Sequence, residues 1–301
     1  MSECSDALDV VEAFYEEPLF RPPSEAGSLI LQVTLGCSHN RCTFCSMYRG
    51  KKFRVKRPDR VRADIAAARA VLGAGVPRVF LADGDAFCLS PRRLGEILGW
   101  LDEAFPRLQR VGIYANARDV LAKSDADLAE LRRRKLKILY VGLESGDDEI
   151  LRRIDKGATV DEIVAAARRA RAADIATSVM VLIGLGGRER SLAHARASAA
   201  AINRMEPSYT ALLTYTPVPG SLLFDEIARG AFELPGPLDS IREIREFLAG
   251  LACRTYFTCN HASNYLPLTG RLPGAQRDLV ALLDAALVGA VPLKPESLRG
   301  L

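Results

Sequence analysis

Short apolar runs alternate with longer amphipathic stretches along most of this 301-residue chain. The runs are rich in Val, Ile, Leu and Tyr, and they are nearly continuous in their hydrophobicity instead of alternating with polar residues. Strands that are covered on both faces of a parallel sheet have this pattern. The chain therefore predicts six strands, at residues 28–35, 78–83, 110–116, 137–144, 176–184 and 209–216.

Helix start signals lie between these runs. Ser90 precedes Pro91, which puts a capping residue before a proline at the first helical position. Thr159 and Glu162 have the spacing of a capping box, and residues 188–204 have the pattern of another helix. Repeated β-α units favour an α/β fold with parallel strands, either an open doubly wound sheet or a partial (β/α)6 barrel.

The β-α alternation ends near residue 220, and helical patterns replace it. We therefore divide the chain into an irregular N-terminal segment (1–27), a core domain (28–220) and a mostly helical C-terminal extension (221–301). One α/β barrel domain of this length is ordinary.

Composition excludes several classes of protein. Charged residues make up 26% of the chain, and the net charge of +4 gives no electrostatic case for nucleic acid or an anionic membrane. No apolar run approaches the roughly 18–20 residues that span a bilayer, so we expect no transmembrane segment. The acidic N-terminus lacks the features of a signal peptide, which predicts a cytoplasmic protein. In that compartment a cysteine cluster indicates metal or redox chemistry and not disulfides.

The loop after the first predicted strand gathers three of the seven cysteines, Cys37, Cys42 and Cys45. Functional groups collect at the carboxyl ends of strands in parallel α/β folds. Thiolates suit zinc or iron–sulfur clusters. Structural zinc sites usually have four protein ligands, often as two CxxC pairs, whereas this loop has one such pair and one further cysteine. Two alternatives stay open, a zinc site completed by His39 or His261 and cysteines buried as small apolar residues.

This loop and the segments that follow resemble the radical S-adenosylmethionine (radical SAM) superfamily. The CxxC half of the motif is retained, with Phe44 before the last cysteine, but the first gap has four residues (Cx4CxxC) where the family usually has three. "LADGDAF" (81–87) is similar to the family's Gly-Gly-Glu-like segment. "YVGLESGDDEILRRIDKG" (140–157) is similar to a segment of the subgroup with oxygen-independent coproporphyrinogen oxidases and tRNA methylthiotransferases. "VMVLIGLGGRE" (179–189) resembles the strand that packs on adenine.

The resemblance implies a metal-binding enzyme in which the three cysteines hold a [4Fe-4S] cluster and S-adenosylmethionine (SAM) chelates the fourth iron. Such an enzyme reductively cleaves SAM to a 5′-deoxyadenosyl radical, which abstracts hydrogen from a substrate. The resemblance also implies which residues contact SAM at the predicted strand ends: Asp83, Gly84, Asp85, Glu144, Ser145 and Gly184.

Further candidates follow from the residues themselves. Asn116 and Arg118 end the third predicted strand and should open into the same cavity, where a guanidinium suits a carboxylate of SAM or substrate. Arg168 is a rival for that carboxylate, although a solvated helix face explains it equally well. For Glu144 we favour ligand contact over helix capping, and we interpret His194 as an incidental residue of an amphipathic helix.

The segment "TYFTCNHASNYLPLTGRLP" (255–273) gathers polar groups without clear periodicity. Such a loop either lines a substrate site or satisfies its own backbone. We favour a substrate role for four of its residues, His261, Asn264, Tyr265 and Arg271. Cys253 and Cys259 are too few for a second cluster, and their role is undecided.

The leading hypothesis is a radical SAM enzyme that uses a [4Fe-4S] cluster, SAM and a one-electron reductant such as flavodoxin or ferredoxin. The chain is too short for an added cobalamin-binding or RNA-binding domain, so we expect a small-molecule substrate and no nucleic acid. The alternative is a non-catalytic zinc- or iron–sulfur-binding module. Fold and cofactor name neither the substrate nor the product.

Overall fold

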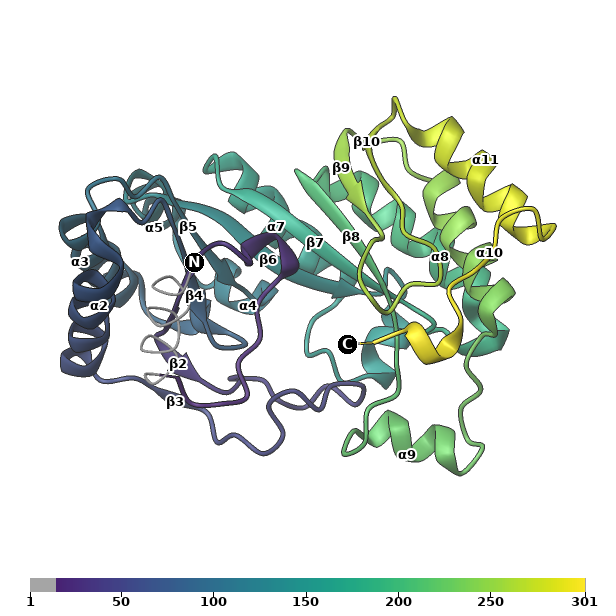
Figure 1. Ribbon diagram of the computed structural model, residues 1–301, viewed down its shortest axis with the longest axis horizontal. Coiled ribbons are helices and arrows are strands. Elements are labelled where there is room, and N and C mark those ends of the chain that lie inside the picture. The colour runs from purple at the N-terminus through teal and green to yellow at the C-terminus, as the bar shows by residue number, and fades with distance from the viewer. Residues whose placement is uncertain (1–14, 301) are drawn as a thin grey trace. The chain divides into compact units, whose positions relative to one another are not determined.

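The computed structural model describes residues 15–300, so part of the predicted segment 1–27 lies outside the described residues. The chain forms two compact units, which we describe separately (Figure 1). Of the described residues, the first unit comprises 15–40, Met47–Tyr140 and Ala172–Ile175. The second comprises Arg41–Ser46, Val141–Arg171 and residues 176–300.

The first unit is built on parallel strands with buried, continuous apolar sequences. The strands that pair in this order are β1 (Leu29–Gln32), β4 (Arg78–Ala82), β5 (Arg110–Tyr114) and β6 (Leu136–Glu144), the last of which continues into the second unit. A two-stranded antiparallel ribbon has one strand on either side of the cysteine loop in the sequence: β2 (Thr34–Leu35) and β3 (Arg54–Val55). The core side chains of β4 are fully buried, Val79, Phe80 and Leu81 among them.

Helices cover these strands in the first unit. They are α2 (Pro58–Leu72), α3 (Pro91–Ala104), α4 (Ala117–Leu121) and α5 (Asp125–Arg133), with short 3₁₀ turns at Pro23–Glu25, Gly73–Gly75 and Ala86–Cys88. α2 and α3 lie side by side (Figure 1). The predicted start of α3 is confirmed, since the Ser90 hydroxyl accepts a hydrogen bond from the Arg93 amide at 3.2 Å.

The further strands of the second unit are β7 (Ala176–Ile183), β8 (Tyr209–Thr214), β9 (Thr255–Thr258) and β10 (Thr269–Leu272). β8 is parallel to both β7 and β9, and β10 is antiparallel to β9. The hydrogen-bonded order of the eight strands is β1-β4-β5-β6-β7-β8-β9-β10.

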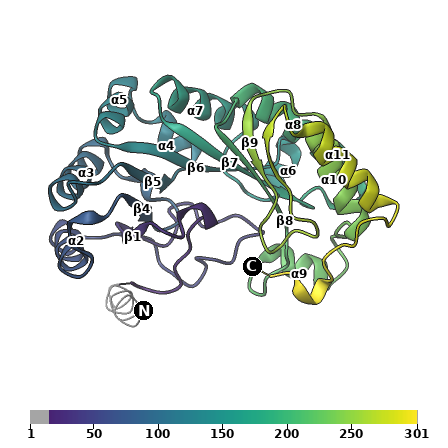
Figure 2. The ribbon, with the colours of Figure 1, turned by 45° about the horizontal axis from the view of Figure 1, so that its top comes forward.

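The helices of the second unit are α6 (Asp148–Arg153), α7 (Val160–Ala172), α8 (Gly187–Met205), α9 (Leu222–Ala228), α10 (Pro237–Ala249) and α11 (Gln276–Leu287), followed by a 3₁₀ turn at Glu296–Leu298. α10 packs against both α8 and α11, and the three helices are drawn close together in Figure 2. The predicted capping box before α7 is confirmed, because the Thr159 hydroxyl accepts the Glu162 amide at 3.2 Å and Glu162 accepts the Thr159 amide at 2.7 Å.

The α/β class with parallel strands is confirmed, and each of the six predicted strands is present. The first of them is split at Val33 into β1 and β2. The prediction for the C-terminal region was incomplete, because two strands, β9 and β10, lie among its helices. Each has only four residues, too few for a period-two pattern to stand out. Among residues 15–300, none of the helices has the length and apolar character needed to cross a bilayer.

Candidate functional site

The cysteine loop starts directly after β2, at Gly36. This residue has a φ of +73°, and a Cβ there would lie 2.8 Å from the Lys51 carbonyl oxygen, so only glycine fits without strain. The Gly36 amide donates a hydrogen bond to Oδ2 of Asp83 at 3.0 Å. The first residue of the loop is thereby fixed to the end of β4.

Asp83 forms a buried ion pair with Lys51, which follows the loop. The Lys51 Nζ lies 2.9 Å from Oδ2 of Asp83, and the two side chains are 9% and 0% exposed. Gln32 donates to the other carboxylate oxygen at 3.2 Å, and Lys51 also donates to the Pro18 carbonyl at 2.9 Å. The oxygens of Asp83 are therefore taken up by protein groups that fasten the loop before and after its cysteines.

The segment that carries Cys42 and Cys45 is a tight turn in the second unit. The Cys45 amide donates to the Cys42 carbonyl at 3.1 Å. Between them, the Thr43 amide donates to the Ile154 carbonyl at 2.9 Å, and the Thr43 carbonyl accepts the Leu223 amide at 2.9 Å. These bonds tie the turn to the end of α6 and the start of α9.

The three thiols of this loop are ligands of the type that binds iron–sulfur clusters. All three cysteines are half-buried and thus within reach of a ligand. The Tyr215 hydroxyl is buried near Cys45 and has no hydrogen-bond partner of ordinary geometry in the described part of the chain. Burial raises the pKa of this phenol, an interaction with the Ser221 side chain opposes the rise, and the negative charge of Cys45 adds to it. Within residues 15–300, no three His, Cys, Asp or Glu side chains are already arranged around a common metal position. The ligand set therefore stays a prediction.

At the ends of β4 and β5 the structure brings together two predicted residues, Asp85 and Arg118. Nη2 of Arg118 lies 3.3 Å from Oδ2 of Asp85, and its Nε lies 3.4 Å from Oδ2 of Asp119. The Ser38 hydroxyl, one residue after Cys37, is hydrogen-bonded to both Asp85 and Arg118. Asp85 is fully buried, whereas the Arg118 side chain is 45% exposed and could meet a ligand.

Asp119, which the sequence analysis missed, adds a titratable group to this cluster. Burial and the adjacent charge of Asp85 raise the pKa of Asp119 to about 6. One carboxylate oxygen of Asp85 is buried without a donor among the described residues, and a proton on Asp119 would supply one. A hydrogen bond between the two side chains also raises the pKa of Asp119.

Gly84 and Asn116, the other predicted residues of this edge, contribute through the backbone. A Cβ on Gly84 would lie 2.4 Å from the ring of Tyr48, so the glycine makes room for that ring. Asn116 is the cap residue of α4, and its carbonyl accepts the Asp119 amide at 3.1 Å.

In the second unit, β6 ends at Glu144, whose φ is +61°. Oε1 of Glu144 lies 2.9 Å from Nζ of Lys156. The next residue, Ser145, is fully buried, and its hydroxyl accepts the Asp147 amide at 3.0 Å. At this strand end the backbone adopts a left-handed conformation, and Glu144 lies beside the ammonium group of Lys156.

The end of β7 is held by a buried histidine–carboxylate pair. The amide of Gly184, which has a φ of +97°, donates to Oε1 of Glu243 at 2.9 Å. The same oxygen lies 2.8 Å from Nδ1 of His194, and Nε2 of His194 lies 3.3 Å from the Glu144 carbonyl oxygen. The sequence analysis interpreted His194 as an incidental residue. In the structure it has a defined role, because it links the ends of β6 and β7. No signal in the sequence pointed to Glu243, which lies on a different helix.

Comparison with known proteins decides the family. The sequence model of the radical SAM superfamily matches residues 31–195, which is more than half of the 301 residues. The chain belongs to the radical SAM superfamily. Its members are enzymes, and the matched range contains the cysteine loop and the strand ends described above.

Individual relatives of this radical SAM enzyme are distant. A curated relative is 4′-phospho-dehydrooxetanocin synthase of Priestia megaterium, 26% identical over 160 residues, which are 47% of this chain and only 21% of the relative. Methylornithine synthase has a similar structure, with a TM-score of 0.53 at 18% identity over 84% of this chain and 69% of its own. Coproporphyrinogen III oxidase from Escherichia coli gives a TM-score of 0.57 at 19% identity over 79% of this chain and 55% of its own. These structural likenesses establish the fold.

One predicted residue of this radical SAM enzyme lies away from the site. Nε of Arg168 donates to the Arg204 carbonyl at 2.7 Å, in the last turn of α8. α7 and α8 lead into the amino ends of β7 and β8, whereas Glu144 and Gly184 lie at carboxyl ends. Arg168 therefore lies at the opposite edge of these strands from Glu144 and Gly184.

The four C-terminal candidates of the radical SAM enzyme have protein partners. Asn264 is fully buried, accepts the Thr214 hydroxyl at 2.9 Å and donates to the Leu212 carbonyl at 2.9 Å. Nδ1 of His261 lies 2.9 Å from the Ser263 hydroxyl. The hydroxyl of Tyr265 donates to Glu296 at 2.9 Å, and Arg271 lies 5.6 Å from the ring centroid of Tyr256. These contacts favour the second interpretation of this segment, in which it satisfies its own polar groups.

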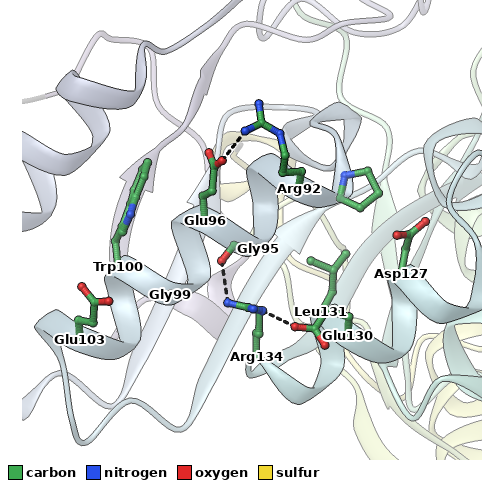
Figure 3. A pocket seen from close by; sticks show the side chains of 11 residues that line it. Arg92, Gly95, Glu96, Gly99, Trp100, Glu103, Asp127, Glu130, Leu131 and Arg134 are labelled. Carbon is green, nitrogen blue, oxygen red and sulfur yellow. Dashed lines mark hydrogen bonds and ion pairs between the residues drawn. The ribbon is translucent and has the colours of Figure 1, made fainter.

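A groove of about 550 Å³ lies on the first unit of the enzyme, between α3 and α5 (Figure 3). Arg134 reaches across it and donates to the Gly95 carbonyl at 3.3 Å. None of the residues that line the groove is a predicted site residue. It is therefore separate from the candidate site.

Proposed function

We propose that this radical SAM enzyme binds a [4Fe-4S] cluster through Cys37, Cys42 and Cys45 and uses SAM as its second cofactor. The observation that carries the proposal is a three-cysteine loop within the matched family region, fastened by hydrogen bonds before, between and after its cysteines. When bound and reduced by one electron, the cluster would supply the reductive cleavage of SAM to methionine and a 5′-deoxyadenosyl radical that abstracts hydrogen from a substrate.

The chain's own residues would bind and orient SAM. Arg118 offers a partly exposed guanidinium for a carboxylate. Glu144 lies at the end of β6, where it would be near an ammonium group or ribose hydroxyls. Asp85 and Ser145 are fully buried, and they would shape the strand ends beside the ligand. Gly184 would let the backbone approach the adenine closely.

We propose a small organic molecule as substrate and a one-electron reductant such as flavodoxin or ferredoxin. The name of the curated relative describes the synthesis of a small phosphorylated product, which supports this class of substrate. In this proposal the core domain is 28–220, and the extension 221–301 adds β9 to β8.

Anaerobic reconstitution of two cysteine variants tests the proposal. We expect the wild-type chain to hold about four irons with matching sulfide and to form 5′-deoxyadenosine from SAM after dithionite reduction. Cys42→Ala should lose both properties. Cys253→Ala is the matched control in the same unit, because its thiol is half-buried and directed at the Ile202 carbonyl, 3.8 Å away. Equal iron in the two variants, or one zinc per wild-type chain without visible iron–sulfur absorbance, would contradict the proposal.

A further inference from the structure

His194 and Glu243 form a pair in the interior of the second unit, on α8 and α10. Both side chains are 0% exposed, and Nδ1 of His194 lies 2.8 Å from Oε1 of Glu243. The Glu243 carboxylate also accepts the Gly184 amide at 2.9 Å and the Ser191 hydroxyl. Buried groups of this kind cost free energy unless they are paired, so a pair that is kept here has either a structural or a functional use.

The contacts of the pair reach the ends of two strands. Nε2 of His194 lies 3.3 Å from the carbonyl oxygen of Glu144, the last residue of β6. Glu144 has a φ of +61°, a conformation that non-glycine residues adopt only when their surroundings hold them there. At the end of β7, the Gly184 amide is held by the other member of the pair. The backbones of both strand ends are therefore bonded to one buried unit.

Each hydrogen bond of the pair has a defined role. A carbonyl oxygen can only accept, so Nε2 of His194 donates to Glu144. The two oxygens of Glu243 accept from the Gly184 amide and the Ser191 hydroxyl, and the oxygen that accepts from Gly184 also faces Nδ1 of His194. The pair therefore joins the backbone at the end of β6 to the backbone at the end of β7.

We propose that His194 and Glu243 are a positioning pair that sets the carboxyl ends of β6 and β7 to receive the nucleoside end of SAM. The inference rests on the proposed function, in which Glu144 and Gly184 lie beside that part of SAM. Neither member of the pair is exposed, so neither touches the ligand, and both act through the backbone atoms that they hold. Small displacements of the groups that bind a ligand weaken its binding, so loss of the pair should lower the affinity for SAM.

Two glutamine variants test the pair. Glu243→Gln keeps the shape and an oxygen for the Gly184 amide, but it replaces the carboxylate opposite Nδ1 of His194 with a neutral amide. His194→Gln removes the contact with the Glu144 carbonyl. The control is Asn203→Ala, because Asn203 also joins α8 to the end of α10, donating to the Gly250 carbonyl at 2.8 Å, at the other end of these helices.

We expect both glutamine variants to hold wild-type iron and to show a KM for SAM that is raised roughly tenfold to a hundredfold, with kcat changed far less. The affinity for S-adenosylhomocysteine, measured by calorimetry, should fall by the same factor. The control should keep wild-type values for both. Nitrogen NMR of the three histidines should also show a His194 signal that shifts in Glu243→Gln.

Removing one member of a buried charged pair strongly destabilises the fold, so a double variant separates stability from affinity. With glutamine at both positions no charge is left behind, and the variant should show the same loss of affinity. Wild-type SAM and S-adenosylhomocysteine affinities in the folded variants would overturn the inference, and so would an equal loss in the Asn203→Ala control. If the wild-type protein itself neither binds nor cleaves SAM, the proposed function fails instead.

Discussion

Replacing Lys51 by methionine tests how the cysteine loop is held. The side chains have similar length, but the variant leaves the fully buried Asp83 carboxylate without the ammonium group that lies 2.9 Å away. The loop would also lose the link from Lys51 to the Pro18 carbonyl. We expect lower stability of the first unit and weaker retention of the cluster.

The contacts give the size of the effect. Removing one partner of a buried ion pair typically costs about 3–5 kcal/mol, because the remaining charge stays buried and uncompensated. The Gly36 amide and Gln32 still donate to Asp83, so the lower end of that range applies. A typical domain has only about 5–15 kcal/mol of stability, and the loss is therefore a large share. Adding Asp83→Asn removes the unpaired charge, so the double variant should be more stable than Lys51→Met alone.

Urea unfolding followed by tryptophan fluorescence measures this unit, since the single tryptophan, Trp100, lies on α3. Iron content after reconstitution measures the loop. A loss below about 1 kcal/mol, as for an exposed ion pair, would refute the reasoning. Additive effects of the two substitutions would refute it as well, because a direct pair must show coupling.

Two further predictions concern the pH dependence of stability at Asp119 and the thermal stability of a Gly146 variant. The pKa of Asp119 is raised by burial and by Asp85 from its usual 3.8 to about 6, so the folded state binds the proton more tightly and stability should fall as pH rises through this window. Asp119→Asn should remove that fall in urea titrations at several pH values, and an unchanged slope would contradict the assignment. Gly146→Ala should lower the thermal midpoint through overpacking of about 1–3 kcal/mol, because its Cβ would lie 2.2 Å from the Ala197 carbonyl oxygen. Gly75→Ala, with open space around it, is the control, and equal midpoints would count against this contact.

The strands were predictable because their side chains are buried on both faces, which leaves a continuous apolar run in the sequence. Residues at strand ends followed from this, and Asp85 and Arg118 do meet, 3.3 Å apart. The starts of helices were equally predictable, because the Ser90 hydroxyl accepts from an amide only three residues further along the sequence. Such features depend on neighbours in the sequence.

Features that depend on distant residues were not predictable. His194 and Glu243 are 49 residues apart, and each alone is an ordinary polar residue on an amphipathic helix. The place of Arg168 beside the Arg204 carbonyl was equally hidden, because a helical pattern shows which face is apolar but not which turn lies nearest the strand ends. β9 and β10 were missed because four-residue strands carry too little pattern.

The two units hold their strand-end loops by the same device. In each, the amide of a glycine with positive φ donates to a fully buried carboxylate, and a buried basic side chain pairs with that carboxylate. The members are Gly36, Asp83 and Lys51 in the first unit and Gly184, Glu243 and His194 in the second. A carboxylate used in this way has few lone pairs left and no exposed surface, so it serves the backbone and not a ligand. Residues that touch SAM or substrate should then be sought among the partly exposed groups beside these anchors, of which Arg118 is the first to test.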